Sequence, residues 1–373
     1  MDTPNTLEAI PFLSLVLATV LYYALKQLAA RLGDDTYQWL KSNLIRGWRW
    51  VVRSPQPVVA TAMHSAADTT STPCPTPPQP AVTEPLPAAK PPTPSITTPK
   101  AQYYALKYGG SGELCEWYRA TQQLSGSTAS QPVILKIARE AQHYDWLQHE
   151  ANILRLLQLE VTPYSKHLPQ VIDQFRMGNQ APALVFPEYE GYTLTQLRQP
   201  FPNGIEPRHL LWILRRCLSV LGYAHSKGIL HGNITPDHIL IRPQDHNVWL
   251  LDWCYAVNRP KETGQRFRVV HPLYSGPEVA EGSPPLPASD IYALGQVMIE
   301  AAGGELASQS IPHSVPERLR RLLQFMVKSS AMQRPSDAWK LYQELDSIRQ
   351  ELFGKHQFVE FIVPNTLQNT QGD

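Results

Sequence analysis

The residue types best suited to chemistry in this chain of 373 residues are glycines, one lysine and one aspartate in apolar surroundings. Gly110 and Gly112 lie in GGSGELC, and glycines let backbone amides approach phosphate oxygens closely. Lys136 in VILKIA offers an ammonium group to an anionic ligand, and Asp252 in VWLLDWC offers the hard oxygen that Mg²⁺ prefers. Taken singly, the glycines are also explained by a tight hairpin turn and the lysine by a solvated strand position.

The segment 101–354 has the composition and periodicity of a folded domain. Its first part contains short runs rich in β-branched and aromatic residues, which are typical of strands: YYALKY, CEWYRA, VILKIA and ALVFPEY. Its second part has apolar residues three and four apart, which predict helices: HEANILRLLQL, HLLWILRRCLSVLGYAHS, SDIYALGQVMIEAAG and ERLRRLLQFMV. A strand-rich piece followed by a helix-rich piece predicts an α+β domain with two lobes.

Taken in order, these pieces resemble the eukaryotic-type Ser/Thr protein kinase domain, which is also found in bacteria. The resemblance covers nearly all of 101–354 and implies a bilobal fold with a β-rich N-terminal lobe and an α-rich C-terminal lobe. The stretches YSGPE, SDIYALG and QRPS match its structural marks. They imply that Glu278 and Arg334 form a buried ion pair and that Asp290 braces the catalytic loop.

The resemblance also implies a site for ATP between the lobes. Gly110 and Gly112 take the first two positions of the glycine-rich loop, whereas Cys115 takes the third and would crowd or reshape the phosphate cradle. Lys136 would hold the α- and β-phosphates, and Glu150, 14 residues further on in HEANILRLL, would be its helix partner.

The stretch LVFPEYEGYTL resembles the hinge that receives adenine. Phe186 stands at the position that controls access to the back of the nucleotide pocket. The carbonyl of Pro187 would face the adenine amino group, and the backbone amide of Tyr189 would donate to the base. We therefore expect the adenine contacts of the resemblance to be available in this chain.

The stretch HGNITPDH, from His231 to His238, resembles a catalytic loop whose central residue is exchanged. Asn233 replaces the aspartate that accepts the proton of the substrate hydroxyl, and a neutral amide can orient that hydroxyl without taking its proton. Losing a general base costs about 10²–10⁴ in rate. Thr235 replaces a lysine that neutralises charge on the phosphoryl group. His238 replaces a Mg²⁺-binding asparagine, and imidazole suits that ion poorly.

Asp252 is then the one strong Mg²⁺ ligand that the resemblance leaves, so we expect Mg²⁺ binding to be weak. Trp253 and Cys254 replace a phenylalanine and a glycine, which reduces the backbone freedom of this segment. Gly232 replaces the arginine that usually receives a phosphate on the activation segment. Phosphorylation, for example at Thr263, is therefore not expected to regulate the chain by that route.

Charge and cysteine content exclude other classes of protein. The 33 Lys and Arg residues balance 32 Asp and Glu residues, so the formal charge of +1 gives no reason to expect binding of nucleic acid. The four cysteines are scattered and form no CxxC pair, which argues against a disulfide framework or a structural zinc site. A reducing compartment suits them.

Residues 1–53 predict attachment to a membrane. Residues 9–25, AIPFLSLVLATVLYYAL, contain 17 uncharged residues, which as a helix would extend about 25 Å against a hydrocarbon core of about 30 Å. The basic and tryptophan-rich stretch LIRGWRWVVR follows and favours a cytoplasmic location for the rest of the chain, with its rings in the headgroup layer. The alternative is a pair of helices that packs on the folded domain.

The two remaining segments have no predicted fold. Residues 54–100 contain 13 prolines and few large apolar residues, so we expect a disordered, extended tether. Docking of PPTP on a partner that reads proline-rich peptides is an alternative role. Residues 355–373 form a tail that the sequence does not assign.

These observations predict a membrane-tethered pseudokinase that serves signalling as a nucleotide-binding or scaffold module, with protein partners that the sequence does not identify. One alternative is an active but atypical Ser/Thr kinase, because positioning and electrostatics supply much of phosphoryl-transfer catalysis. Another is a small-molecule phosphotransferase of the antibiotic-kinase type, whose loop begins His-Gly-Asp. The stretches YSGPE and SDIYALG argue against that alternative.

Overall fold

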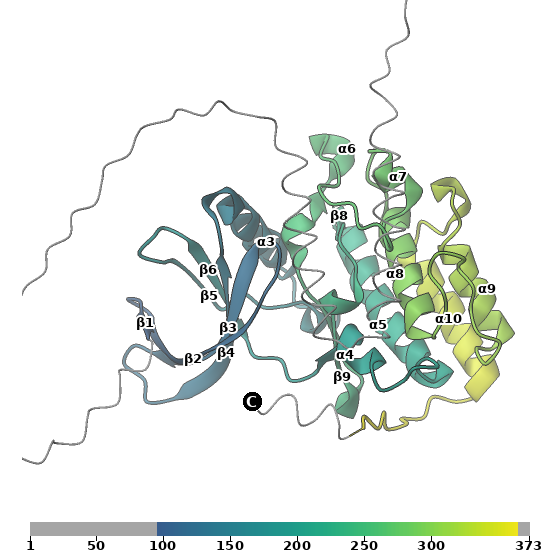
Figure 1. Cartoon of the computed structure of the whole chain (residues 1–373), viewed down its shortest axis with the longest axis horizontal. Helices are drawn as coiled ribbons and strands as arrows, with labels where there is room; N and C mark the ends of the chain where they lie inside the picture. Colours follow the sequence, from purple (N-terminus) through teal and green to yellow (C-terminus); the bar gives the residue numbers. More distant parts are fainter. Residues whose placement is uncertain (1–94, 365–373) are drawn as a thin grey trace, which may run out of the picture. The chain divides into compact units, whose positions relative to one another are not determined.

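The computed structural model describes residues 95–364, which form a strand-rich part followed by a helix-rich part (Figure 1). The predictions for the apolar run 9–25 and for the proline-rich tether up to residue 94 lie outside the described residues. None of the helices between residues 95 and 364 combines the length and the apolar character that crossing a membrane requires.

The N-terminal part is a six-stranded antiparallel sheet with the strand order β1-β2-β3-β4-β6-β5. The strands are β1 Ile96–Thr97, β2 Ala101–Ser111, β3 Cys115–Leu124, β4 Ser130–Ala138, β5 Asp173–Arg176 and β6 Pro182–Pro187. Val133 and Leu135 of β4 are fully buried in the core on one face of this sheet. The alternation of a strand therefore puts Ile134 and Lys136 on the opposite face.

Helix α3, Tyr144–Leu157, follows β4 and contacts β6 of the sheet. Its apolar residues recur at the spacing of one helix face, and Leu147, Ala151 and Leu154 are fully buried. Glu150 lies among these residues and is only 2% exposed. A carboxylate this deeply buried requires a partner, and the partner defines the site described below.

The C-terminal part is helical and is built around two buried helices, α5 and α8 (Figure 1). Its helices are α4 Leu194–Arg198, α5 Pro207–Ser226, α6 Pro260–Thr263, α7 Pro277–Ala280, α8 Pro287–Ala301, α9 Glu317–Met326 and α10 Ala338–Phe353. Short strands carry the loops of the site: β7 Tyr192–Thr193, β8 Ile229–Leu230, β9 Ile239–Arg242, β10 Asn247–Leu250 and β11 Val257–Asn258. Helix α5 contacts α8 and α10, so it forms the centre of this part.

The predicted α+β arrangement, strands first and helices second, is confirmed, and each quoted strand and helix pattern overlaps an element of that type, with one or two residues of some patterns lying beyond its end. The structure differs at both predicted domain boundaries. Strand β1 pairs with β2, so the end of the predicted tether belongs to the sheet. In the predicted tail, Phe361 is 5% exposed and stacks on His209 of α5 with ring centres 4.2 Å apart. Apolar side chains in both segments explain this packing, because burying them is favourable.

Candidate active site

Three charged side chains meet between the two parts of the domain. Strand β4 positions Lys136, α3 positions Glu150, and the turn after β10 positions Asp252. The Nζ atom of Lys136 lies 2.7 Å from Oε2 of Glu150 and also donates to Oδ1 of Asp252. The structure thus brings the predicted lysine, its helix partner and the predicted metal ligand into one cluster.

Burial and charge act in opposite directions on this cluster. Burial alone would lower the pKa of Lys136, but the two carboxylates raise it well above its usual value. Burial alone would raise the pKa of Asp252, but the charges of Lys136 and His238 hold it far below its usual range. Burial raises the pKa of Glu150 in spite of the nearby ammonium group. Lys136 therefore remains charged and links the two carboxylates.

Asp290 of α8 holds the start of the catalytic loop, residues 231–238, by hydrogen bonds to its backbone. The two carboxylate oxygens of Asp290 accept from the backbone amides of His231 at 2.8 Å and Gly232 at 2.9 Å. One of them also lies 2.9 Å from Nε2 of His225. This arrangement agrees with the bracing role that the resemblance implies for Asp290.

The side chain of His231 makes its hydrogen bonds within the protein. Its side chain is fully buried, and Nε2 lies 2.9 Å from the carbonyl oxygen of Leu251. Its Nδ1 accepts from the backbone amide of Asn233 at 3.2 Å. Burial lowers the pKa of His231 to about 4, so the ring is neutral near pH 7 and serves to hold the loop.

The other exchanged residues of the loop, Asn233, Thr235 and His238, differ in burial and in their contacts. Asn233 is half-buried, whereas Thr235 is only 6% exposed and begins a 3-10 turn that ends at His238. The Nδ1 atom of His238 lies 2.8 Å from the backbone oxygen of Asn233, and Nε2 lies 3.3 Å from Oδ2 of Asp252. Both oxygens of Asp252 therefore have nitrogen neighbours within the protein.

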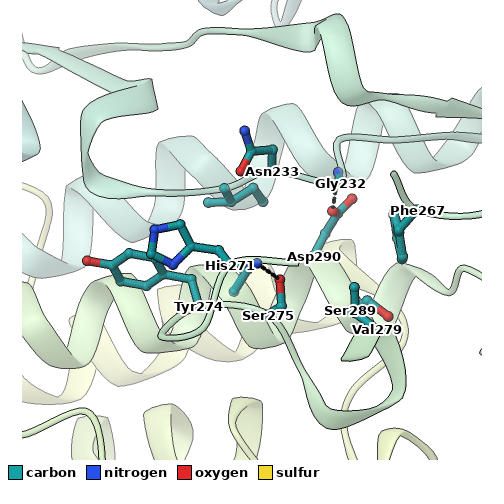
Figure 2. Close-up of a pocket in the computed structure, with 11 residues that line it drawn as sticks. Gly232, Asn233, Phe267, His271, Tyr274, Ser275, Val279, Ser289 and Asp290 are labelled. Carbon is teal, nitrogen blue, oxygen red and sulfur yellow. Dashed lines mark hydrogen bonds between the residues drawn. The ribbon is translucent and has the colours of Figure 1, made fainter. Parts of the chain in front are cut away.

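A cavity of about 20 Å³, room for about one water molecule, lies beside the catalytic loop. Figure 2 shows Gly232 and Asn233 of the loop around it, together with Phe267, His271 and Asp290. A Cβ atom at Gly232 would lie 2.9 Å from the ring of Phe267, and the glycine has a left-handed φ of +75°. The resemblance has an arginine at position 232. In this chain the ring of Phe267 occupies the space beside Gly232 that such a side chain would enter.

The glycine-rich loop is the β2–β3 hairpin, closed by a hydrogen bond of 2.8 Å from the Gly112 amide to the carbonyl of Cys115. Cys115 is 5% exposed, and burial raises the pKa of its thiol to about 12, so it is a packing residue. At the hinge, Phe186 is 8% exposed and Pro187 ends β6. The ring of Tyr189 packs against that of Trp249. The adenine contacts of this backbone stay predictions.

The predicted buried ion pair is present and is bidentate. Both terminal nitrogens of Arg334 lie 2.7 Å from oxygens of Glu278. The guanidinium group of Arg334 also lies over the ring of Tyr292, with 4.4 Å from its carbon to the ring centre. Glu278 lies in the first turn of the short helix α7, so this pair fixes the end of the activation segment to the helical part.

Comparison with known proteins identifies the family of this domain. The family model named Protein kinase domain matches residues 103–357. The chain belongs to the protein kinase family. That model covers both parts of the described structure, from β2 to the residues after α10.

Individual relatives are serine/threonine kinases. The chain is 28% identical over 201 residues to the serine/threonine-protein kinase PAK mbt of Drosophila melanogaster, a match that covers 53% of this chain and 29% of that protein. It is 28% identical over 214 residues to PrkC of Bacillus subtilis, covering 55% and 31%. It is 28% identical over 226 residues to PknA of Nostoc, covering 57% and 39%. The chain thus spans about a third of the length of these relatives.

Kinase relatives generally use ATP and Mg²⁺, and the residues of this cleft fit the metal poorly. Mg²⁺ demands an octahedron of hard oxygen ligands. Here Asp252 is the one carboxylate at the predicted metal position, and Lys136 and His238 already lie against its oxygens. Imidazole at His238, where the resemblance has an oxygen ligand, also suits Mg²⁺ poorly.

Two features of the kinase cleft were missed by reasoning from the sequence. The first is the packing of Trp117 against Gly109. The signal for it was the glycine pair in YGGSG followed by a tryptophan eight residues later, a small residue that can face a large one. Arg119 reaches the hinge, where its Nε atom donates to Oε1 of Glu188 at 2.9 Å. Pairing of β2 with β3 brings Trp117 to Gly109, whereas Arg119 reaches Glu188 across β4, and neither register could be read from the sequence alone.

Proposed function

We propose that this member of the kinase family is a pseudokinase, which binds a nucleotide or a protein partner without transferring phosphate. The observation that carries the proposal is the centre of the catalytic loop. Asn233 cannot accept a proton, and the loop's one carboxylate, Asp237, is exposed to solvent. The contacts of Asp252 with Lys136 and His238 support the same conclusion, because they engage the carboxylate that a catalytic metal would need.

The test is phosphate transfer by the purified full chain to itself and to a generic protein substrate, with ATP and either Mg²⁺ or Mn²⁺. We expect no transfer above that of the Lys136→Ala variant. A variant in which three residues return to the kinase pattern, Asn233→Asp, Thr235→Lys and His238→Asn, should gain activity. Turnover by the natural chain that equals this repaired variant and is lost in Lys136→Ala would overturn the proposal.

Nucleotide binding is tested separately from turnover. If ATP binds, a concentration of 100 Kd stabilises the folded state by about 2.7 kcal/mol, which a thermal-shift measurement detects. Because the cleft fits Mg²⁺ poorly, we expect the shift to be nearly the same with and without the metal. Absence of any shift would favour the scaffold role over the nucleotide-binding role.

An active but slow Ser/Thr kinase is the second candidate, and one observation favours it. The contact between Lys136 and Glu150, 2.7 Å long, already has the arrangement that holds phosphates in active members of the family. The transfer assay above separates this candidate from the pseudokinase.

We further propose that residues 1–53 attach the chain to a membrane and leave the kinase domain in the cytoplasm. The uncharged run 9–25 and the basic, tryptophan-rich stretch after it support this. The full chain should sediment with vesicles of mixed neutral and anionic lipids, whereas a chain without residues 1–53 should stay in the supernatant. Equal distribution of the two chains would contradict the membrane proposal and leave the pseudokinase proposal intact.

A further inference from the structure

The residues after α10 fold back onto the helical part as an extended segment. We call residues 355–364 the terminal segment; in Figure 1 it runs in yellow from the end of α10 towards β9. It contains no helix or strand, and Gly354, which has a left-handed φ of +70° and open space around it, separates it from α10. Attachment of the terminal segment therefore does not depend on pairing in a sheet.

Aromatic side chains from two elements form the surface on which this segment lies. His209 and Trp212 lie three residues apart on α5 and therefore share one face of that helix. The Nε1 atom of Trp212 donates to Nδ1 of His209 at 3.1 Å, which fixes the two rings relative to each other. The ring of His246, from the turn between β9 and β10, stacks on Trp212 with ring centres 4.2 Å apart and an angle of 8° between the planes. We call His209, Trp212 and His246 the aromatic surface.

Two phenylalanines of the terminal segment, three residues apart, contact the aromatic surface. Phe361 is 5% exposed, and its ring lies nearly parallel to that of His209, with an angle of 10° and ring centres 4.2 Å apart. The ring of Phe358 lies against that of His246, with centres 4.4 Å apart. Between the two phenylalanines, the carbonyl oxygen of Val359 accepts from Nε2 of His246 at 2.8 Å. The surface thus recognises two aromatic rings at a spacing of three residues and one backbone carbonyl.

The terminal segment is only partly buried. Residues 355–357 are exposed, and so are Phe358 at 55% and Ile362 at 74%. A short segment near the end of a chain, joined to it by a glycine, opens at a lower cost than unfolding of the whole domain. Opening would uncover the rings of the aromatic surface, and large, rigid aromatic side chains are the usual anchors of protein interfaces.

We propose that the aromatic surface is a docking site for a segment of a protein partner that carries two aromatic residues three positions apart, and that the terminal segment competes with this partner for it. The inference rests on the proposed function, in which the chain binds a protein partner. His246 lies at the tip of the β9–β10 hairpin, whose two ends lead to His238 and Asp252 of the cleft. The docking site and the cleft therefore share one structural element.

The experiment measures binding of a fluorescent peptide of residues 355–364, KHQFVEFIVP, to the full chain. Phe361→Ser weakens the hold of the terminal segment, so this variant should bind the peptide. A tethered segment has an effective concentration on the order of 1 mM, so a peptide that binds the variant with a Kd of about 100 μM should bind the natural chain about tenfold more weakly. Ile362→Ser is the matched control, because Ile362 belongs to the same segment but is 74% exposed. It should bind the peptide as weakly as the natural chain does.

A second peptide tests the spacing of the aromatic residues. KHQFVEIFVP has the same composition but places its phenylalanines four positions apart, so in an extended chain the second ring turns away from the surface. It should not bind Phe361→Ser. Equal binding of the two peptides would contradict the proposed chemistry of the partner.

Two further results would overturn the inference: equal peptide binding by the natural chain and Phe361→Ser, or no binding by a Phe361→Ser chain that still unfolds cooperatively. If this variant does not fold, hydrogen exchange of the natural chain provides the test. Excess unlabelled peptide should speed exchange of the amides of residues 358–363 and leave β4 unchanged, and unchanged exchange at 358–363 would contradict the inference. The phosphate-transfer assay is independent, because turnover would overturn the pseudokinase proposal without changing peptide binding.

Discussion

Replacing Lys136 with methionine should destabilise the domain, because it leaves two carboxylates without their shared ammonium partner. Breaking a buried ion pair by removing one partner costs about 3–5 kcal/mol. Glu150 is 2% exposed, but the side chains of Lys136 and Asp252 keep 17% and 22% exposure, so some solvent reaches the cluster. We therefore expect the lower end, about 3 kcal/mol. At about 2–4 °C for each kcal/mol in a domain of this size, the melting temperature should fall by about 6–12 °C.

The assay is urea unfolding of the full chain followed by circular dichroism, and the chain offers a matched control. Lys227 lies 2.7 Å from Glu160, the same distance as in the Lys136–Glu150 contact, but the side chains of this pair are 34% and 63% exposed to solvent. Lys227→Met should therefore leave the unfolding midpoint unchanged, because exposed ion pairs contribute little. Adding Glu150→Gln to Lys136→Met should recover part of the loss, since a buried amide costs less than an unpaired carboxylate.

The loss should also depend on pH with a definite sign. Burial raises the pKa of Glu150, and removing the ammonium of Lys136 raises it further. A carboxyl group whose pKa is higher in the folded state destabilises that state as pH rises through the interval between the two values. The deficit of Lys136→Met should therefore be smaller at pH 5 than at pH 7. A loss below 1 kcal/mol, or the same loss at both pH values, would refute the reasoning.

Three further predictions concern the frame. Arg334→Ala should cost about 3–5 kcal/mol in urea unfolding, because it leaves Glu278 buried and unpaired, and a cost below 1 kcal/mol would contradict this. Gly232→Ala combines a left-handed φ with a Cβ 2.9 Å from the ring of Phe267, so limited trypsin digestion should cut the activation segment faster than in the natural chain. Burial lowers the pKa of His209 to about 4, so its contribution to stability is lost as pH falls from about 6.5 towards 4, and His209→Gln should flatten the dependence of the unfolding midpoint on pH in that range.

Periodicity predicted the elements that bury one face, because burial imposes a repeat on the sequence. The pattern VILKIA predicted β4, with Val133 and Leu135 on one face and Lys136 on the other. The apolar spacing after residue 206 predicted the buried helix α5. The ion pair of Glu278 with Arg334 followed from motifs in the right order. These features depend on the local sequence pattern or on motifs that occur in a fixed order in the family.

What the sequence did not predict depends on contacts between distant segments. Strand β1 contains only two residues and lies beside prolines, so no sequence pattern distinguishes it from a tether. Its pairing with β2 makes it part of the sheet. The packing of Phe267 at Gly232 and of Phe361 on His209 joins segments 35 residues or more apart. Composition indicated that these aromatic residues were available for burial, but not where they would be buried.

On the proposed function, the locations of the exchanged and retained residues explain how a kinase frame could persist without phosphate transfer. Asp290 and Arg334 are buried and paired, so replacing either leaves a charge or a donor without a partner and costs folding free energy. Asn233 and His238 line a cleft and are half-buried, so exchanges there cost little packing. The imidazole of His238 also gives Asp252 a nitrogen neighbour at 3.3 Å. Because Lys136 and His238 lie against the oxygens of Asp252 within the protein, the cleft can keep its shape without a metal ion, as the proposed binding role requires.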